Sequence, residues 1–200
     1  FNKVKAQQLQ VDFLINNAGL LQNGFFVKLS LAKQEAMMQV NVVALTCLTH
    51  LFANDMASRK SGHILNLAST AAWMPIPNEN VYAATKAFVL SFTQALADEM
   101  AALNSGVTIS ALCPGYTATK MMDNPDQGAT LKISSDMMMA PAVVAEIGLN
   151  GCLAGKVTIV PGLSNKFVTL LSHLLPKMTF AKILGAFYRK NLVQTATTDF

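Results

Sequence analysis

Short apolar runs and longer segments with helical periodicity alternate along the chain. The apolar runs cover residues 11–15, 63–69, 107–113 and 156–160. Gly, Pro or Asn residues border each run, and the runs are mostly apolar rather than strictly alternating with polar positions. This pattern is typical of strands that are buried on both faces of a parallel sheet.

The segments between these runs predict helices. Apolar residues recur every three or four positions over 31–53, where Ser30 is a good N-cap, and over 81–103. Pro141 opens another helix that runs to Leu153, and residues 1–10 are typical of a helix end. The alternation predicts an α/β fold with helices covering a parallel sheet. Residues 116–136 are polar and irregular, so we expect a mobile segment there.

A tyrosine and a lysine four residues apart are the first candidates for chemistry. Tyr82 and Lys86 share one face of the 81–103 helix, so the Lys86 ammonium can lie beside the Tyr82 phenol. A free tyrosine has a pKa near ~10, and a neighbouring positive charge lowers it. The pair is therefore a candidate acid–base unit. Taken alone, the same spacing is more often a surface tyrosine beside a solvated lysine.

The positions of other polar residues strengthen this interpretation. Asn16–Gly19, Ser69 and Pro114-Gly115 each follow or close an apolar run. The carboxyl ends of parallel strands meet at one edge of a sheet, where ligands bind. We therefore expect these segments to lie together near Tyr82, with the Ser69 hydroxyl placed to bind a reacting oxygen.

Asn41 is an unusual residue in the middle of the 31–53 helix. The simplest interpretation of a mid-helix asparagine is an exposed polar position. Its neighbours Val40 and Val42 are apolar, which weakens that interpretation without excluding it.

Composition and charge narrow the class of protein. Of the 200 residues, 52% are hydrophobic and 13% are charged, which indicates one globular domain with a sizeable core. The net charge of +4 includes no long basic run and no base-reading motif, so we expect no nucleic-acid partner. No run reaches the ~18 uninterrupted apolar residues of a membrane-spanning helix, and no signal peptide is visible.

Three cysteines bear on the cellular compartment. Cys47, Cys113 and Cys152 have no CxxC spacing, and each lies among apolar residues. We therefore expect buried, reduced thiols, no metal site and a cytoplasmic location.

The tail carries two apolar helix stripes separated by Pro176. The first stripe is Phe167, Leu170, Leu171, Leu174 and Leu175, and the second is Phe180, Ile183, Leu184, Phe187 and Tyr188. The second helix also carries Lys177, Lys182, Arg189 and Lys190. Four alternatives remain: packing on the domain's own core, a lid over a substrate pocket, a subunit interface, or docking on an anionic membrane. We rank the membrane low because four charges attract it modestly. Our hypothesis places the first helix beside the substrate site and the second against a partner subunit or a membrane.

Together these motifs resemble the short-chain dehydrogenase/reductase family. The matching residues are Asn16-Asn17-Ala18-Gly19, Asn41, Ser69, Tyr82 to Lys86, and Pro114-Gly115 with Thr119, and they fit the family over about residues 10–162. The resemblance implies a Rossmann-like, doubly wound parallel sheet with helices on both faces. It divides the chain into the C-terminal part of an NAD(P)-binding domain, residues 1–162, and a helical extension, residues 163–200.

The resemblance also implies an NAD(P)-dependent oxidoreductase that interconverts a hydroxyl and a carbonyl. Tyr82 would be the catalytic acid–base, and Lys86 would lower its pKa and bind the nicotinamide ribose. Ser69 would hold the substrate oxygen, and Asn41 would anchor a water molecule of the proton relay.

Further residues would contact the cofactor. Asn16, Ala18 and Gly19 would line it near the adenine-side ribose. Pro114, Gly115 and Thr117 would face the nicotinamide, although Thr117 stands where the family usually has Ile or Val. Thr119 would reach the carboxamide or the phosphates.

These residues lack the Gly-rich turn with which the family begins. The missing elements amount to roughly 70–90 residues, at ~30 for each strand–helix–strand unit. We favour a partial sequence over a truncated protein, whose sheet would expose an apolar edge. The alternative function is a catalytically inactive binding or scaffold protein of the same fold. The intact Asn41, Ser69, Tyr82 and Lys86 favour the enzyme.

The tail resembles that of reductases acting on long-chain 3-oxoacyl groups and steroids. We therefore expect a hydrophobic substrate of that kind, NADP (or NAD) as cofactor, and a homo-oligomer. Flexible apolar residues near the expected substrate loops support this: Trp73, Met74, Ile76, Met121, Met122 and Met137–Met139. Ordinary core packing is the alternative for each of them.

Overall fold

A four-stranded parallel sheet forms the centre of the computed structural model, which describes residues 1–122 and 124–194. The strands lie in the order β1 (Phe13–Asn16), β2 (Gly62–Leu67), β3 (Val107–Leu112) and β5 (Thr158–Ile159). Each begins and ends within one or two residues of a predicted apolar run, so the predicted strands are confirmed. The last residues of the expected helical extension, 195–200, lie outside the described part of the chain.

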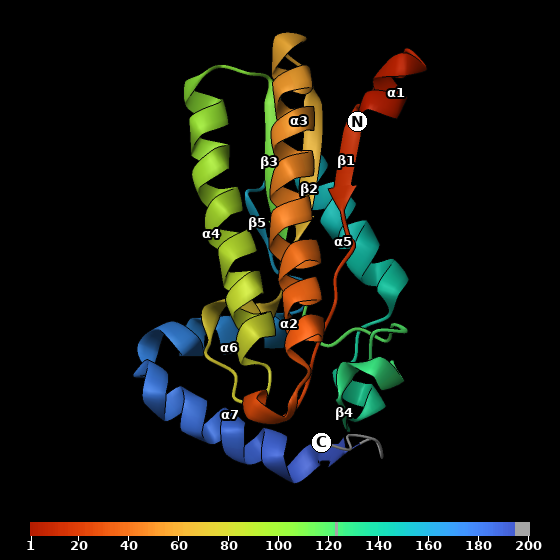
Figure 1. The fold of residues 1–200 in the computed structure, drawn as a ribbon. Helices are drawn as coiled ribbons and strands as arrows, with labels where there is room; N and C mark the ends of the chain where they lie inside the picture. Colours follow the sequence, from red (N-terminus) through yellow and green to blue (C-terminus); the bar gives the residue numbers. More distant parts are fainter. Residues whose placement is uncertain (123, 195–200) are drawn as a thin grey trace.

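Helices cover both faces of this sheet, as expected (Figure 1). On one face, α2 (Leu31–Met38), a π-helical segment (Gln39–Ala44) and α3 (Leu45–Ser58) form one continuous helix beside α4 (Asn80–Ala102). On the other face lies α5 (Pro141–Leu153), while α1 (Asn2–Ala6) precedes β1. Ser30 caps α2, because its Oγ accepts a hydrogen bond from Lys33 N.

Two further helices lie across the end of the molecule where the strands finish (Figure 1). They are α6 (Leu163–Leu174) and α7 (Lys177–Asn191), and Pro176 separates them as predicted. After α7, β6 (Leu192–Gln194) pairs antiparallel with β4 (Ala129–Leu131). The expectation that residues 116–136 are irregular throughout is therefore wrong. The pairing that orders β4 comes from residues about sixty positions later. Short 3₁₀ turns cover Phe26–Lys28, Thr70–Trp73, Pro125–Gln127 and Ser135–Met137.

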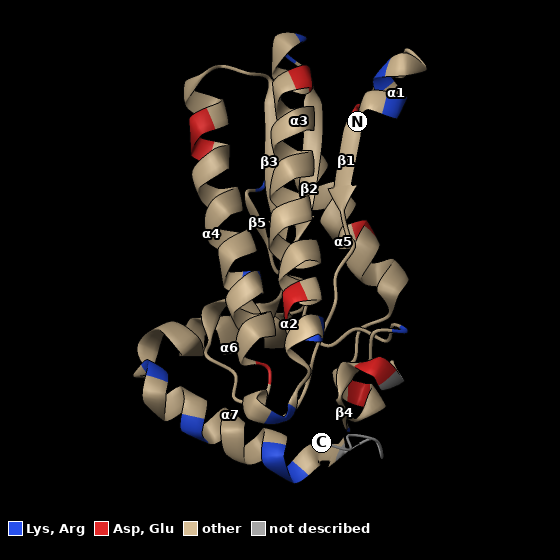
Figure 2. Ribbon diagram, viewed as in Figure 1, with Lys and Arg blue, Asp and Glu red and all other residues tan. Residues whose placement is uncertain are grey.

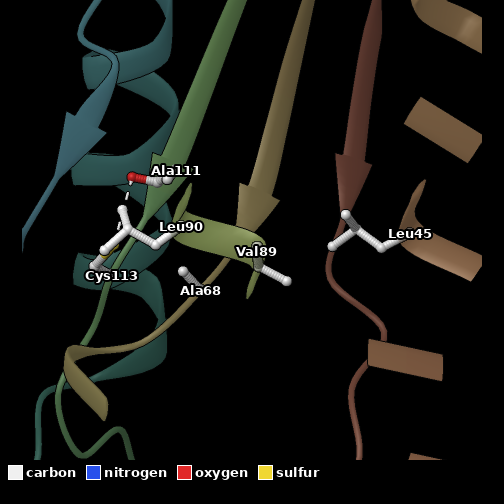
Figure 3. Packing of buried hydrophobic residues seen from close by; sticks show 6 residues of the cluster. All are labelled: Leu45, Ala68, Val89, Leu90, Ala111 and Cys113. Atoms are coloured by element: carbon white, nitrogen blue, oxygen red, sulfur yellow. Dashed lines mark hydrogen bonds between the residues drawn. The ribbon is translucent and has the colours of Figure 1, made fainter. Parts of the chain in front are cut away.

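The core between the helices and the sheet is filled by small and branched side chains. Figure 3 shows Val89 and Leu90 of α4 beside the ends of β2 and β3, and Leu45 of α3 beside the end of β1. Small residues there, Ala68 and Ala111, let α4 approach the sheet closely. All these side chains are buried. Together with the neighbouring clusters they hold the carboxyl ends of the strands in fixed positions.

The three cysteines are free thiols with different environments. Cys113 and Cys152 are buried, as expected. Cys47 is exposed, which corrects the expectation, because position 47 lies on the outer face of α3.

The stretch Leu31–Ser58 is long and apolar enough to cross a membrane by length and composition alone. Its apolar residues also serve the core: Leu45 packs with Ala68 and Ala111, and Met56 packs with Ile64 and Ile109.

β1 is an edge strand of the four-stranded sheet. Its residue Ile15 is half-exposed.

A buried hydrogen-bond network joins the sheet to the helices above it. Asn16 Nδ2 of β1 donates to Asn66 Oδ1 of β2 at 2.8 Å and to Thr49 Oγ1 of α3 at 2.9 Å. Asn66 Nδ2 in turn donates to Thr93 Oγ1 of α4 at 3.0 Å. Buried amides are stable only when they are paired in this way.

Replacing the central amide tests this network. We expect Asn66→Ala to lower the free energy of unfolding by about 1–3 kcal/mol, because it leaves buried polar groups on Asn16 and Thr93 with fewer partners. Asn54→Ala, on the exposed side of α3, is the matched control and should change it by no more than ~0.5 kcal/mol. Urea unfolding gives the free energy of unfolding of both variants. Equally small losses of this free energy in the two variants would contradict the structural role of the network.

Candidate active site

Ser69 and Tyr82 meet just beyond the carboxyl end of β2. Ser69 follows the strand and caps the Thr70–Trp73 turn, where its Oγ accepts from Ala71 N at 3.1 Å. The same Oγ lies 3.4 Å from Pro114 O, which follows β3. The Ser69 and Tyr82 side chains are hydrogen-bonded to each other. The structure thus brings the two strand ends and the start of α4 together, as the sequence predicted.

Lys86 lies one helical turn after Tyr82 and is almost fully buried, with 5% of its surface exposed. Its Nζ donates to Leu67 O at 2.8 Å and lies 5.6 Å from the centroid of the Tyr82 ring. Burial lowers the pKa of Lys86 to about 8. The ammonium is therefore held against the end of β2.

The pKa of Tyr82 differs from the sequence-based expectation. Burial raises this pKa above its ordinary value, the negative charge of Glu79 raises it further, and the hydrogen bond with Ser69 opposes the rise. The expected lowering by Lys86 is wrong for this geometry, because the Leu67 carbonyl holds the ammonium over the ring and burial outweighs the other effects. At neutral pH the Tyr82 side chain is a phenol.

Asn41 is buried, with 1% of its surface exposed, so the exposed interpretation is excluded. Its amide clamps the loop after β1: Oδ1 accepts from Leu20 N at 2.8 Å, and Nδ2 donates to Leu20 O at 2.9 Å. Nδ2 also reaches Thr85 Oγ1 of α4 at 3.1 Å. Asn41 lies in the π-helical segment, a wide turn of the kind often found at functional sites.

Gly19 leaves space beside the catalytic side chains. A Cβ built on Gly19 would lie 3.5 Å from Asn41 Oδ1 and 3.6 Å from Lys86 Nζ. A cavity of about 540 Å³ begins at Gly19 and extends toward the loop after β3, and its lining is Gly19, Leu20, Leu21, Lys120, Met121, Asn124 and Gln127. The exposed Ala18 adjoins it in sequence. Because Gly19 has no side chain, a ligand hydroxyl can approach the Lys86 ammonium from this side.

The other predicted cofactor residues divide into two groups. The Asn16 side chain is buried, and its amide bonds to Thr49 and Asn66 in the network of β1, β2 and α3, so a cofactor contact of Asn16 through its backbone stays a prediction. Pro114, Gly115 and Thr117 follow β3 and are half-buried, whereas Thr119 is exposed. Gly115 lies directly against the Asn165 side chain at the start of α6.

Three residues that the sequence analysis did not select complete the site. The Tyr188 hydroxyl of α7 lies 3.0 Å from the Tyr116 hydroxyl and is hydrogen-bonded to the Glu79 carboxyl. Burial raises the pKa of Glu79 to about 7 and that of Tyr116 to about 12. Glu79 precedes Tyr82 by three residues, which is a signal the sequence offered. Tyr188 was visible only as a member of an apolar stripe.

α7 covers this cluster, which corrects the hypothesis about the tail. Tyr188 is 2% exposed and packs with Ala71, Met74 and Leu131, beside Tyr82. Gly185 lets α7 approach Pro77 closely, since an added Cβ would lie 3.0 Å from the ring. The second tail helix, rather than the first alone, therefore borders the candidate catalytic residue Tyr82, and one of its faces packs on the domain's own core.

The apolar residues expected near the substrate take separate positions. Met74 and Ile76 join the cluster around Tyr82, and Met121 lines the first cavity. Met139 packs in the core against the sheet, and Met137 is exposed. Trp73, Met74 and Ile76 also line a second, largely apolar cavity of about 420 Å³ beside Lys177, which Ser69 and Tyr82 do not line. In the described part of the chain no three His, Cys, Asp or Glu side chains gather to hold a metal ion.

The buried Glu79 carboxyl predicts a pH dependence of stability. Its pKa is about 7 in the folded chain against 4.5 for an ordinary carboxyl. Between these values the unfolded chain has released the proton that the folded chain keeps. The free energy of unfolding should therefore fall as pH rises from 4.5 to 7, by on the order of 3 kcal/mol, at about 1.36 kcal/mol per pKa unit. Urea unfolding across this range should show a smaller fall for Glu79→Gln. Parallel curves for the variant and the wild type would contradict the assignment.

Comparisons with known proteins agree with this geometry. The family model of short chain dehydrogenases matches residues 1–129. Ketoacyl reductase HetN of Nostoc sp. is 37% identical over 140 residues, which are 68% of this chain and 48% of that protein. Estradiol 17-beta-dehydrogenase 11 of Macaca fascicularis is 31% identical over 180 residues, which are 90% of this chain and 58% of that protein.

A solved structure shows the same fold. A short-chain dehydrogenase from Sphingobium yanoikuyae, solved in complex with NADPH, aligns with a TM-score of 0.68 and 24% identity over 94% of this chain and 68% of that one. The chain spans about half the length of the curated relatives it matches. The family model covers well over half of the 200 residues, including β1, β2 and the segment with Ser69, Tyr82 and Lys86. The chain therefore belongs to the short-chain dehydrogenase family.

Proposed function

We propose that the protein is an NAD(P)-dependent oxidoreductase that interconverts a hydroxyl and a carbonyl. The observation that carries this proposal is the meeting of half-buried Ser69 and Tyr82 with buried Lys86, with the amide of Asn41 beside Gly19. When bound, the nicotinamide cofactor supplies or accepts the hydride. The residues of this chain then handle the proton and hold the substrate oxygen.

Tyr82 and Ser69 are the groups that meet that oxygen. Tyr82, kept protonated by burial, donates its proton to a carbonyl oxygen in the reducing direction. The Ser69 hydroxyl, already hydrogen-bonded to Tyr82, fixes the same oxygen. The NADPH present in the Sphingobium yanoikuyae structure supports NADP over NAD as the cofactor.

Lys86 binds the nicotinamide ribose in this proposal. An ammonium has three donors, and the described residues show one of them on Leu67 O, so others are available for ribose hydroxyls. Ala18 and Gly19 line the cofactor on one side. Pro114, Gly115, Thr117 and Thr119 line it on the other side.

Asn41 serves the proton relay through its backbone. Its side-chain amide already bonds Leu20 and Thr85, so a relay water is better held by a carbonyl of the wide π-helical turn.

The substrate is hydrophobic, of the 3-oxoacyl or steroid-like class. Apolar side chains surround Tyr82: Met74, Ile76, Leu131, Phe180 and Leu184. The names of the ketoacyl reductase and the estradiol dehydrogenase relatives fit the same class.

We further propose a homo-oligomer located in the cytoplasm. The outer side of the adjacent helices α3 and α4 exposes Leu48, Leu51 and Phe88, which supports a contact between subunits there.

Removing the Tyr82 hydroxyl tests the central role. In the full-length enzyme we expect Tyr82→Phe to lower kcat by roughly 10²–10⁴-fold while the cofactor still binds, because only the proton donor is lost. Tyr116→Phe removes a nearby hydroxyl and keeps the Ser69–Tyr82 pair, so it should cost much less. Steady-state kinetics on a 3-oxoacyl substrate measure both. Activity of Tyr82→Phe within about tenfold of wild type would refute the assignment.

Lys86→Met tests the second role. We expect weaker NADPH binding and a lower kcat together, because Lys86 serves both the ribose and the position of Tyr82. Lys156→Met, an exposed lysine near β5, is the matched control and should change neither. Fluorescence titration gives the Kd for NADPH, and an unchanged Kd in Lys86→Met would exclude the ribose contact.

A further inference from the structure

The helix α6 is amphipathic, but its apolar side faces outward. Leu163, Phe167, Leu170 and Leu174 lie on one face at spacings of four, three and four residues. Their exposed fractions are 83%, 60%, 58% and 70%. The opposite face is buried and polar, with Thr169 and Ser172 each 7% exposed. Amphipathic helices normally pack their apolar face on the core, so this orientation calls for a partner outside the described fold.

Polar groups on the buried side of α6 have hydrogen-bond partners. Thr169 Oγ1 donates to Lys166 O at 2.9 Å, and Ser172 Oγ donates to Thr169 O at 2.7 Å. Burial of these hydroxyls therefore leaves neither donor unpaired. Asn165 at the start of α6 also bonds Pro161 O at 2.7 Å and packs on Gly115.

α7 also exposes apolar side chains, and the tail carries positive charge. Met178, Ile183 and Phe187 are exposed on α7, at the same end of the molecule as α6 (Figure 1). From Leu163 to Gln194 the chain has no Asp or Glu, and its basic residues are Lys166, Lys177, Lys182, Arg189 and Lys190. Figure 2 shows Lys and Arg residues at intervals along α7, with no acidic residue on either helix.

We propose that this outer tail surface docks on an anionic lipid bilayer. We define the outer tail surface as Leu163, Phe167, Leu170, Leu174, Met178, Ile183 and Phe187 with the five basic residues around them. An apolar helix face flanked by Lys and Arg is the arrangement that lies in the interface of a membrane. The apolar residues enter the boundary between headgroups and acyl chains, and the cations meet the anionic headgroups.

The charge of this surface favours lipid over a second copy of the chain. A two-fold contact would place the same patch on both subunits, so the basic residues of one copy would face those of the other. An anionic bilayer presents the opposite charge over the whole patch. The proposal does not depend on the oxidoreductase activity, because none of these residues belongs to the catalytic group.

Vesicle binding tests the proposal with the full-length protein. The probes are vesicles of phosphatidylcholine alone and vesicles with a quarter of phosphatidylglycerol. We expect co-sedimentation with the anionic vesicles to be at least tenfold stronger, and to fall as salt rises from about 0.1 M to about 1 M. Absence of binding, or equal binding to both vesicles at all salt concentrations, would overturn the proposal.

Paired variants locate the binding surface. Phe167→Ser with Leu170→Ser should weaken binding to anionic vesicles at least tenfold. The control is Val27→Ser with Leu103→Ser, which removes two exposed apolar residues elsewhere and should leave binding unchanged. Lys177→Glu with Lys182→Glu tests separately whether positive charge contributes to vesicle binding. Lys60→Glu with Lys156→Glu is its control.

Sedimentation velocity tests whether a second copy of the chain, rather than lipid, covers the outer tail surface. If the wild type forms a dimer that Phe167→Ser with Leu170→Ser dissociates, and vesicle binding is absent, the surface is a contact between subunits and the lipid proposal is wrong. Equal vesicle binding by the tail variants and their controls would also reject it. Circular dichroism of each variant confirms that the comparison is between folded proteins.

Discussion

A buried ammonium at the end of β2 links the elements that carry the candidate catalytic residues. A charged group with so little exposure needs a close partner, and Leu67 O supplies it at 2.8 Å. Because Lys86 belongs to α4 and Leu67 to β2, this one bond sets the position of the helix along the strand. Tyr82, one turn earlier on α4, and Ser69, two residues beyond Leu67, are then brought within hydrogen-bond reach of each other.

Buried side-chain amides join the other secondary-structure elements around the site. Asn41 joins the wide turn of the α2–α3 helix to the Leu20 backbone, and Asn66 joins β1, β2 and α4 through Asn16 and Thr93. Each amide satisfies partners from different elements, so none of these elements can shift alone without leaving a buried polar group unpaired. These bonds tie the edge of the sheet beside the candidate catalytic residues to the helices that cover it.

The sequence predicted the features that depend on local pattern and missed those that depend on environment. Strands and helices follow from runs of apolar residues, and the meeting of Ser69 with Tyr82 follows from the parallel sheet. The direction in which Asn16 points depends on its place in the strand, which spacing alone does not reveal. The pKa of Tyr82 depends on burial by α7. The stripe of α6 was visible, but periodicity does not tell which face turns inward, and β4 needed a partner strand from the far end of the chain.

The two faces of α7 have different surroundings. Tyr188 reaches Tyr116 and Glu79 on the inner face, while Lys182 and Ile183 lie on the outer face. Because both faces belong to one helix, a partner that holds the outer face also holds the Tyr188 hydroxyl in place against Tyr116.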